Sequence, residues 1–223
     1  MSSEFNPVIT DCGIADYRSM LARQRELFAE LVGRKRRGEP VEHEYLLLLE
    51  HNDVITCGRH ANHANLLVSA DRLGSMGIEV VEIERGGDIT YHGPGQLVVY
   101  PIIDLSLHGL GVRDYVSLLE ESVIRTIARW GVIGERIDGA TGVWIGKGTP
   151  EERKICAIGV RCSRYITMHG LALNVNTDLS KFKLINPCGF IDKGVTSMQK
   201  EHGHVVDMTE VKNVFREQFL NLF

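Results

Sequence analysis

The chain has 223 residues, of which 43% are hydrophobic and 24% charged, as in an ordinary globular protein with one substantial core. Its formal net charge of −4 gives no general attraction to nucleic acid or to an anionic membrane. The longest strongly apolar run, residues 97–103, is too short to span a bilayer, and no secretory or transit signal is visible at the N-terminus. Five cysteines without a C-x-x-C pair predict free thiols in a reducing compartment, so we expect a cytoplasmic protein.

Hydrophobic periodicity predicts three long helices. The first begins after Asp16, a good N-cap residue, and its apolar positions recur every three or four residues until Gly38. The second runs from about Val112 to Trp130. The third lies near the C-terminus and would be capped by Thr209.

Strand-like runs lie between these helices. They are residues 45–49, 54–57, 80–83, 97–103, 142–145, 155–162 and 166–175. Short connections join the last three runs, which should therefore pair antiparallel. Because strands and helices mix without regular βαβ alternation, we expect an α+β (irregular α/β) fold with a mixed, largely antiparallel sheet flanked by helices. No repeat or linker divides the chain, which predicts a single domain over residues 1–223.

Residues 85–96, RGGDITYHGPGQ, form the most distinctive segment. Glycines let the backbone adopt positive φ and let a ligand approach the main chain, and the other side chains offer a guanidinium, hydroxyls, an imidazole and an amide. Such a segment between two strand-like runs is typical of a ligand-shaping loop, with a plain surface connection as the alternative. It is not a nucleotide fingerprint, because the G-x-G-x-x-G spacing is absent and no G-K-[ST] follows.

Cys188 is the candidate nucleophile among the cysteines. It lies in the segment INPCGF (185–190), where Pro187 fixes φ and Gly189 leaves room beside the sulfur. A structural loop cysteine is the alternative interpretation. The other cysteines lie in apolar strand patterns or near the N-terminus, where an inert thiol is the usual case.

A thiol with a pKa of about 8.5 needs a nearby cation or base to react at neutral pH. Lys154 is the candidate activator, since it opens the otherwise apolar strand 154–160; a solvated strand end is the alternative. His92 and His169 are also available, so a Cys/His hydrolase stays open at this point. The pattern HANH at residues 60–63 offers no third ligand, and we expect no metal site.

Four separated motifs occur in order along the chain. They are RGGDITYHGPGQLVVY (85–100), KICAIG (154–159), HGLALNV (169–175) and INPCG (185–189). With them, residues 45 to about 197 resemble the lipoyl(octanoyl) transferases, which move an octanoyl group from acyl carrier protein to lysines of lipoyl domains. The resemblance implies the fold of the biotin/lipoate protein ligase catalytic domains, with a catalytic core over residues 41–223. One departure is Asn52, which stands in a loop where proline is more usual.

By this resemblance, Cys188 is the acyl-thioester nucleophile and Lys154 lowers its pKa. The residues implied to line the acyl and thioester pocket are Arg85, Gly86, Gly87, Asp88, Ile89, Thr90, Tyr91, His92, Ala157, Ile158, Gly159, Gly170, Leu171 and Ala172. The donor would be octanoyl-acyl carrier protein, and the acceptors the lipoyl domains of 2-oxoacid dehydrogenase complexes and the glycine cleavage H protein. A monomer is expected, without cofactor or ATP, since the donor is already a thioester and no phosphate-cradling motif is present.

Two rival functions belong to other classes. A lipoate or biotin protein ligase would share the fold but would require ATP, Mg²⁺ and an adenylate-binding loop rich in glycine and arginine, whereas residues 85–96 contain one arginine. A non-catalytic module that binds acyl carriers or lipoyl domains would not need Lys154 and Cys188 together.

Acyl carrier proteins are acidic, so a basic docking surface is expected despite the net charge of −4. The densest basic cluster is RKRR at residues 34–37, but cations are also what the C-terminal end of a helix favours. Arg161, Arg164, Lys181 and Lys183 lie nearer the motifs in sequence and are the favoured docking group.

Overall fold

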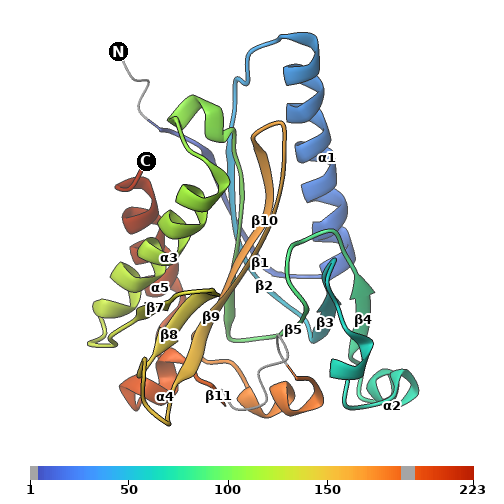
Figure 1. Ribbon diagram of the computed structural model, residues 1–223, viewed down its shortest axis with the longest axis vertical. Helices are drawn as coiled ribbons and strands as arrows, with labels where there is room; N and C mark the ends of the chain where they lie inside the picture. The colour runs from blue at the N-terminus through green and yellow to red at the C-terminus, as the bar shows by residue number, and fades with distance from the viewer. Residues whose placement is uncertain (1–4, 187–193) are drawn as a thin grey trace.

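A computed structural model describes residues 5–186 and 194–223, and Figure 1 shows its ribbon. Cys188, with Pro187 and Gly189 of the same motif, lies outside the described residues. The strands are β1 (Val8–Ala15), β2 (Tyr45–His51), β3 (Val54–Cys57), β4 (Glu79–Glu82), β5 (Ile89–His92), β6 (Gln96–Ile102), β7 (Glu135–Ile137), β8 (Ala140–Ile145), β9 (Arg153–Ser163), β10 (Ile166–Asn174) and β11 (Gly194–Val195). The α-helices are α1 (Tyr17–Arg37), α2 (Ala70–Ser75), α3 (Val112–Ala128), α4 (Met198–His202) and α5 (Met208–Leu220), and the 3-10 helices are η1 (His63–Asn65), η2 (Leu105–His108) and η3 (Leu179–Leu184).

The strands form two sheets. The larger has the order β1-β2-β6-β10-β9-β8-β7, with β11 beside β9, and the smaller has the order β4-β3-β5. Three pairs are parallel, namely β1 with β2, β3 with β4 and β9 with β11, and the remaining pairs are antiparallel. The prediction of a mixed, largely antiparallel sheet flanked by helices is confirmed.

Helices cover both faces of the larger sheet (Figure 1). On one face, α3 and α5 pack over a core that includes Leu119, Phe215 and Leu173. On the other face, α1 packs over a second core that includes Leu31 and Tyr100. No helix in the described ranges is long and apolar enough to cross a lipid bilayer.

The three long helices lie where periodicity predicts them, with one error at a cap. Asp16 caps α1 by accepting a hydrogen bond from the Ser19 N–H at 2.8 Å, and Gly38 ends that helix with φ of 71°. The cap of α5 is Asp207, not Thr209, because the Asp207 carboxylate accepts from the Thr209 N–H at 2.8 Å. The helix therefore begins one residue before Thr209.

The glycine-rich segment 85–96 is not a continuous loop. Its middle is β5, which pairs antiparallel with β3 and gives the smaller sheet a third strand. Ile89 and Tyr91 alternate as buried side chains within it, a strand period that the surrounding glycines obscure in the sequence. The segment thus consists of two turns around a short strand.

Candidate active site

A pocket of about 620 Å³ opens beside β9 and β10, where the turn before β5 approaches the larger sheet. Every predicted substrate-binding residue except Tyr91 lines it, and so does Lys154. Tyr91 instead donates a hydrogen bond from its hydroxyl to Asp53 at 2.6 Å and packs its ring edge-on against Phe182. Residues 85–100 and 154–174, which are far apart in the sequence, therefore contribute to one cavity.

Glycines allow the turn 85–88 to lie directly against its neighbours. A Cβ atom at Gly159 would lie 2.9 Å from the carbonyl oxygen of Gly86, and one at Gly58 would lie 2.4 Å from that of Gly87. Neither distance is compatible with a side chain. The Gly86 N–H also donates to the carbonyl of Val160 at 3.0 Å, which attaches the turn to β9. Glycine is therefore needed at positions 58 and 159 for this close backbone approach.

Arg85 stabilises the same turn through hydrogen bonds from its buried side chain. Its guanidinium is buried and donates to the carbonyl oxygen of Thr56 at 2.8 Å and to the Thr56 hydroxyl at 3.0 Å. It also donates to the Gly86 carbonyl at 3.0 Å. A buried cation is stable only with such partners, so these bonds place a fixed positive charge in the pocket wall.

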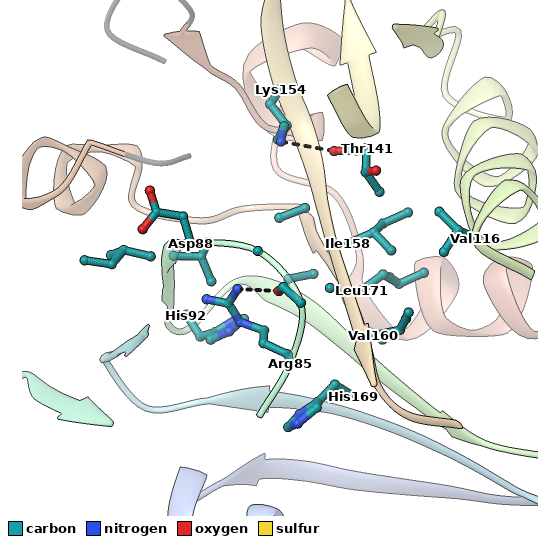
Figure 2. Close-up of a pocket in the computed structure, with 18 of the residues that line it drawn as sticks. Arg85, Asp88, His92, Val116, Thr141, Lys154, Ile158, Val160, His169 and Leu171 are labelled. Carbon is teal, nitrogen blue, oxygen red and sulfur yellow. Dashed lines mark hydrogen bonds between the residues drawn. The ribbon is translucent and has the colours of Figure 1, made fainter. Parts of the chain in front are cut away.

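The pocket wall has two chemically different sides, on opposite sides of β9 in Figure 2. One side carries Val116 of α3, Ile158 and Leu171. Leu171 belongs to the core under α3, and Ile158 packs against that core. Arg85 and His92 lie on the other side. Their side also carries the polar lining residues Tyr17, Tyr100 and Asn174, of which Tyr17 lies outside the four sequence motifs. Tyr17 is the first residue of α1, and nothing local in the sequence distinguishes a pocket tyrosine from a core tyrosine.

Two of the histidines that line the pocket, His92 and His169, are neutral at physiological pH. Burial, the largest cause, lowers the pKa of both His92 and His169 to about 3. His92 bonds Gln96 Oε1 through Nδ1 at 2.8 Å, so its ring orientation is fixed. His169 has φ of 62°, and its backbone N–H donates to Gln24 Oε1 of α1 at 3.1 Å. Neither imidazole is a cation that could stabilise a thiolate.

Lys154 is the cation that the pocket offers beside β8. Its Nζ donates to the carbonyl oxygen of Thr141 at 3.1 Å (Figure 2). The same Nζ lies 4.6 Å from the ring centroid of Trp144. On the other side of β9, β11 pairs in parallel, with Val195 opposite Lys154. The Thr196 N–H donates to the Lys154 carbonyl at 2.9 Å. The chain that follows Cys188 therefore returns to the sheet at Lys154.

The four described cysteines are poor nucleophiles. They are Cys12, Cys57, Cys156 and Cys162. Burial is the largest cause that raises the thiol pKa of each, and the rise is greatest for the fully buried Cys156. A thiol with a raised pKa is protonated at neutral pH and does not attack a thioester at a useful rate.

No cluster of three or more potential metal-ligating His, Cys, Asp or Glu side chains occurs in residues 5–186 and 194–223. In the HANH pattern, His63 lies 3.4 Å from a Glu82 carboxylate oxygen.

The chain is similar to proteins of one family over most of its length. Residues 16–220 match the lipoyl protein ligase A/B catalytic domain. An octanoyltransferase of Bacteroides fragilis is 52% identical over 213 residues, which cover 96% of this chain and 96% of that protein. An octanoyltransferase of Bacteroides thetaiotaomicron is 52% identical over 205 residues, which cover 92% of this chain and 90% of that protein.

Solved structures show the same fold at much lower identity. Lipoate-protein ligase A bound with ATP has a TM-score of 0.70 at 17% identity, over 99% of this chain and 85% of that one. A bipartite lipoate protein ligase from Thermoplasma acidophilum also has a TM-score of 0.70 at 17% identity, over 97% of this chain and 83% of that one. The fold implied by the motif resemblance is thereby confirmed. Since the catalytic domain of one family matches nearly the whole sequence, the chain belongs to the lipoyl protein ligase A/B catalytic domain family.

Proposed function

We propose that the protein transfers an octanoyl group from octanoyl-acyl carrier protein to the acceptor lysine of lipoyl domains, through a thioester on Cys188. The relatives at 52% identity are octanoyltransferases, which supports octanoyl as the transferred group. The observation that carries the assignment of the catalytic pair is the pairing of Val195 with Lys154, because it returns the chain to Lys154 seven residues after Cys188.

The chemistry requires two transfers. In the first, the Cys188 thiolate attacks the thioester carbonyl of the donor, a new C–S bond forms, and the carrier thiol leaves with a proton. In the second, the acceptor lysine amine attacks the acyl-enzyme, an amide C–N bond forms as the Cys188 C–S bond breaks, the amine proton passes to Lys154, which gave up its own proton in the first transfer, and the Cys188 thiolate is regenerated. The first step exchanges one thioester for another and the second forms a more stable amide, so no ATP is required. Splitting one slow aminolysis into two transfers is the usual advantage of covalent catalysis.

Lys154 would supply the charge that this route needs. As a cation beside the thiol it lowers the thiol pKa, and it can donate a proton to the leaving carrier thiolate. At Cys156, two residues from Lys154 in the same strand, burial raises the thiol pKa by more than the charge of Lys154 lowers it, so proximity to Lys154 alone does not activate a buried thiol.

The acyl chain would lie along β9 and β10. On the side of the turn 85–88, Ala157 faces Ala172 across the two strands, and these small side chains leave space above the sheet. Ile89 also lines the pocket and is fully buried. Small apolar side chains along the strands, with a few polar groups such as Arg85 and His92 on the same side, are the usual design of a site that holds and orients a small acyl group.

The reducing, cytoplasmic compartment predicted from the cysteines suits a thiol nucleophile, and we keep it as part of the proposal. The rival ligase function would need ATP. It is tested by the same assay, because a ligase forms no acyl-enzyme from an acyl carrier protein in the absence of nucleotide.

The decisive experiment is intact-mass spectrometry after mixing the protein with octanoyl-acyl carrier protein. Wild type should gain one octanoyl group, on Cys188, in a form that hydroxylamine removes. Cys188→Ala should gain none, whereas Cys162→Ala, which changes another thiol on β9, should be acylated like wild type. Acylation of Cys188→Ala, or a requirement for ATP, would exclude the proposed route.

A further inference from the structure

Asp88 holds the turn 62–65, which includes η1. Its carboxylate is half-buried, and Oδ1 accepts a hydrogen bond from the Asn62 backbone N–H at 2.9 Å. Its Oδ2 accepts a second bond from the side-chain amide of Asn65. One carboxylate therefore fixes both ends of the turn 62–65.

The same turn holds the chain just before Cys188. The carbonyl oxygen of Asn65 accepts a hydrogen bond from the Asn186 N–H at 2.7 Å. Beside it, Leu66 and Ile185 form an antiparallel bridge. Asn186 is the last described residue before the segment that contains Cys188, so the turn 62–65 fixes the point from which that segment begins.

The backbone of Asp88 is itself well fixed. The Gly58 N–H donates to the Asp88 carbonyl at 3.1 Å, and the His60 N–H donates to the Gly87 carbonyl at 3.1 Å. Both carboxylate oxygens already accept bonds from protein donors. Asp88 also lines the pocket, so direct contact with the donor is the competing role.

We propose that Asp88 is a positioning residue, which acts through the turn 62–65 to fix Asn186 relative to Lys154, rather than a residue that binds the acyl donor. This inference rests on the proposed function. The other end of the segment is held independently, because β11 pairs with β9 at Lys154. Loss of the contact that holds Asn186 should lower the rate of octanoyl transfer, since a misplacement of about 1 Å can lower a rate roughly 100-fold.

Three variants separate the two roles. Asp88→Ala removes both bonds. Asp88→Asn removes the charge but keeps an acceptor for the Asn62 N–H, and rotation of the Asn65 amide gives its new amide an acceptor. Asn65→Ala removes one bond and leaves the carbonyl that holds Asn186. Asp207→Ala is the matched control, because it deletes another carboxylate that accepts from a backbone N–H, at α5.

The measurements are the single-turnover rate of octanoyl transfer to the enzyme and the pH dependence of Cys188 alkylation. Asp88→Ala should lower the transfer rate at least tenfold, leave KM for the donor within about twofold, and move the alkylation midpoint toward the ordinary thiol pKa of about 8.5. Asn65→Ala should shift both quantities in the same direction by less. Asp88→Asn should recover at least a third of the wild-type rate, and Asp207→Ala should change neither quantity.

If Asp88→Asn lowered the transfer rate as much as Asp88→Ala, the negative charge of Asp88 would be needed for the donor, and the inference would be overturned. An unaffected Asn65→Ala, or an unchanged alkylation midpoint in all three variants, would overturn it as well. If Asp88→Ala does not fold, as circular dichroism would show, the other two variants still decide between the roles. Failure of wild type to become acylated on Cys188 would instead refute the proposed function, so the two failures are distinguishable.

Discussion

Burial decides the protonation state of most ionisable groups around the pocket. It lowers the pKa of His92 and His169 to about 3 and raises the pKa of Cys156, so each of these groups is neutral at pH 7. Lys154, in contrast, has a carbonyl oxygen and an aromatic face as partners. A Cys/His dyad, which the sequence left open, would have to form an imidazolium ion where burial strongly disfavours it.

The role of Lys154 can be divided between charge and proton transfer. Lys154→Arg keeps the positive charge but cannot surrender its proton at accessible pH. We therefore expect this variant to keep a lowered Cys188 pKa, measured as the midpoint of alkylation rate against pH, while octanoyl turnover falls at least tenfold. In Lys154→Gln both properties should be lost. Full turnover in Lys154→Arg would show that Lys154 carries no proton.

At the scale of elements, the sequence predicted the features that depend on interactions within one segment of the chain. The apolar period and the caps of α1 are visible in the sequence because both lie within one segment, and the hairpins of β8 to β10 are visible because their connections are short. Strand β1 was missed because it is an edge strand with mostly exposed side chains, and only pairing with β2 makes it a strand. The meeting of the turn 85–88 with β9 was not predictable from spacing, because it depends on a long-range fit between glycines.

The corrected cap of α5 makes a prediction about stability. Asp207→Ala should lower the free energy of unfolding by about 1 kcal/mol, because the first turn of α5 loses the acceptor of the Thr209 N–H. Thr209→Ala should change it by less than about 0.5 kcal/mol, since Thr209 is exposed and is not the cap. Urea unfolding followed by circular dichroism measures both. A larger loss in Thr209→Ala would contradict the assignment of the cap.

In the whole molecule, the basic residues considered for docking lie in several different places. Arg161 lies over the Phe28 ring and 3.4 Å from Glu84, and Arg164 lies in the β9–β10 turn, at the end of β9 opposite to Lys154. In the RKRR cluster, the side chains of residues 34, 35 and 37 form ion pairs with acidic side chains. Neither the favoured group nor this cluster is therefore a continuous basic surface at the pocket.

Arg59 and Lys183 are better placed for contact with the carrier protein at the pocket. Both are exposed, and they are the sequence neighbours of the pocket-lining residues His60 and Phe182. Among the residues that the structure describes, neither has an acidic partner at ion-pair distance. Arg59→Glu with Lys183→Glu should raise KM for octanoyl-acyl carrier protein about fivefold or more at low salt and flatten its salt dependence. A small octanoyl thioester donor should react as before.

Arg164→Glu is the control for each single variant of this pair, since it makes the same charge change as Arg59→Glu or Lys183→Glu but at the far end of β9. It should leave KM for the carrier donor nearly unchanged. An equal rise in KM in the control would show that overall charge, rather than the pocket mouth, governs the encounter.

The strand order of the larger sheet also constrains how the chain assembles during synthesis. β6 lies between β2, which precedes it, and β10, which pairs Leu171 with Val99 across 171 − 99 = 72 residues of sequence. A chain emerging from the ribosome therefore exposes one edge of β6 until β10 has been made, and pairing over such a separation is slow because the intervening loop must first be closed. The pocket wall is completed still later, when β11 reaches Lys154. Premature termination between β6 and β10 would thus leave an unpaired apolar strand, the kind of intermediate that chaperones bind and that aggregates when they do not.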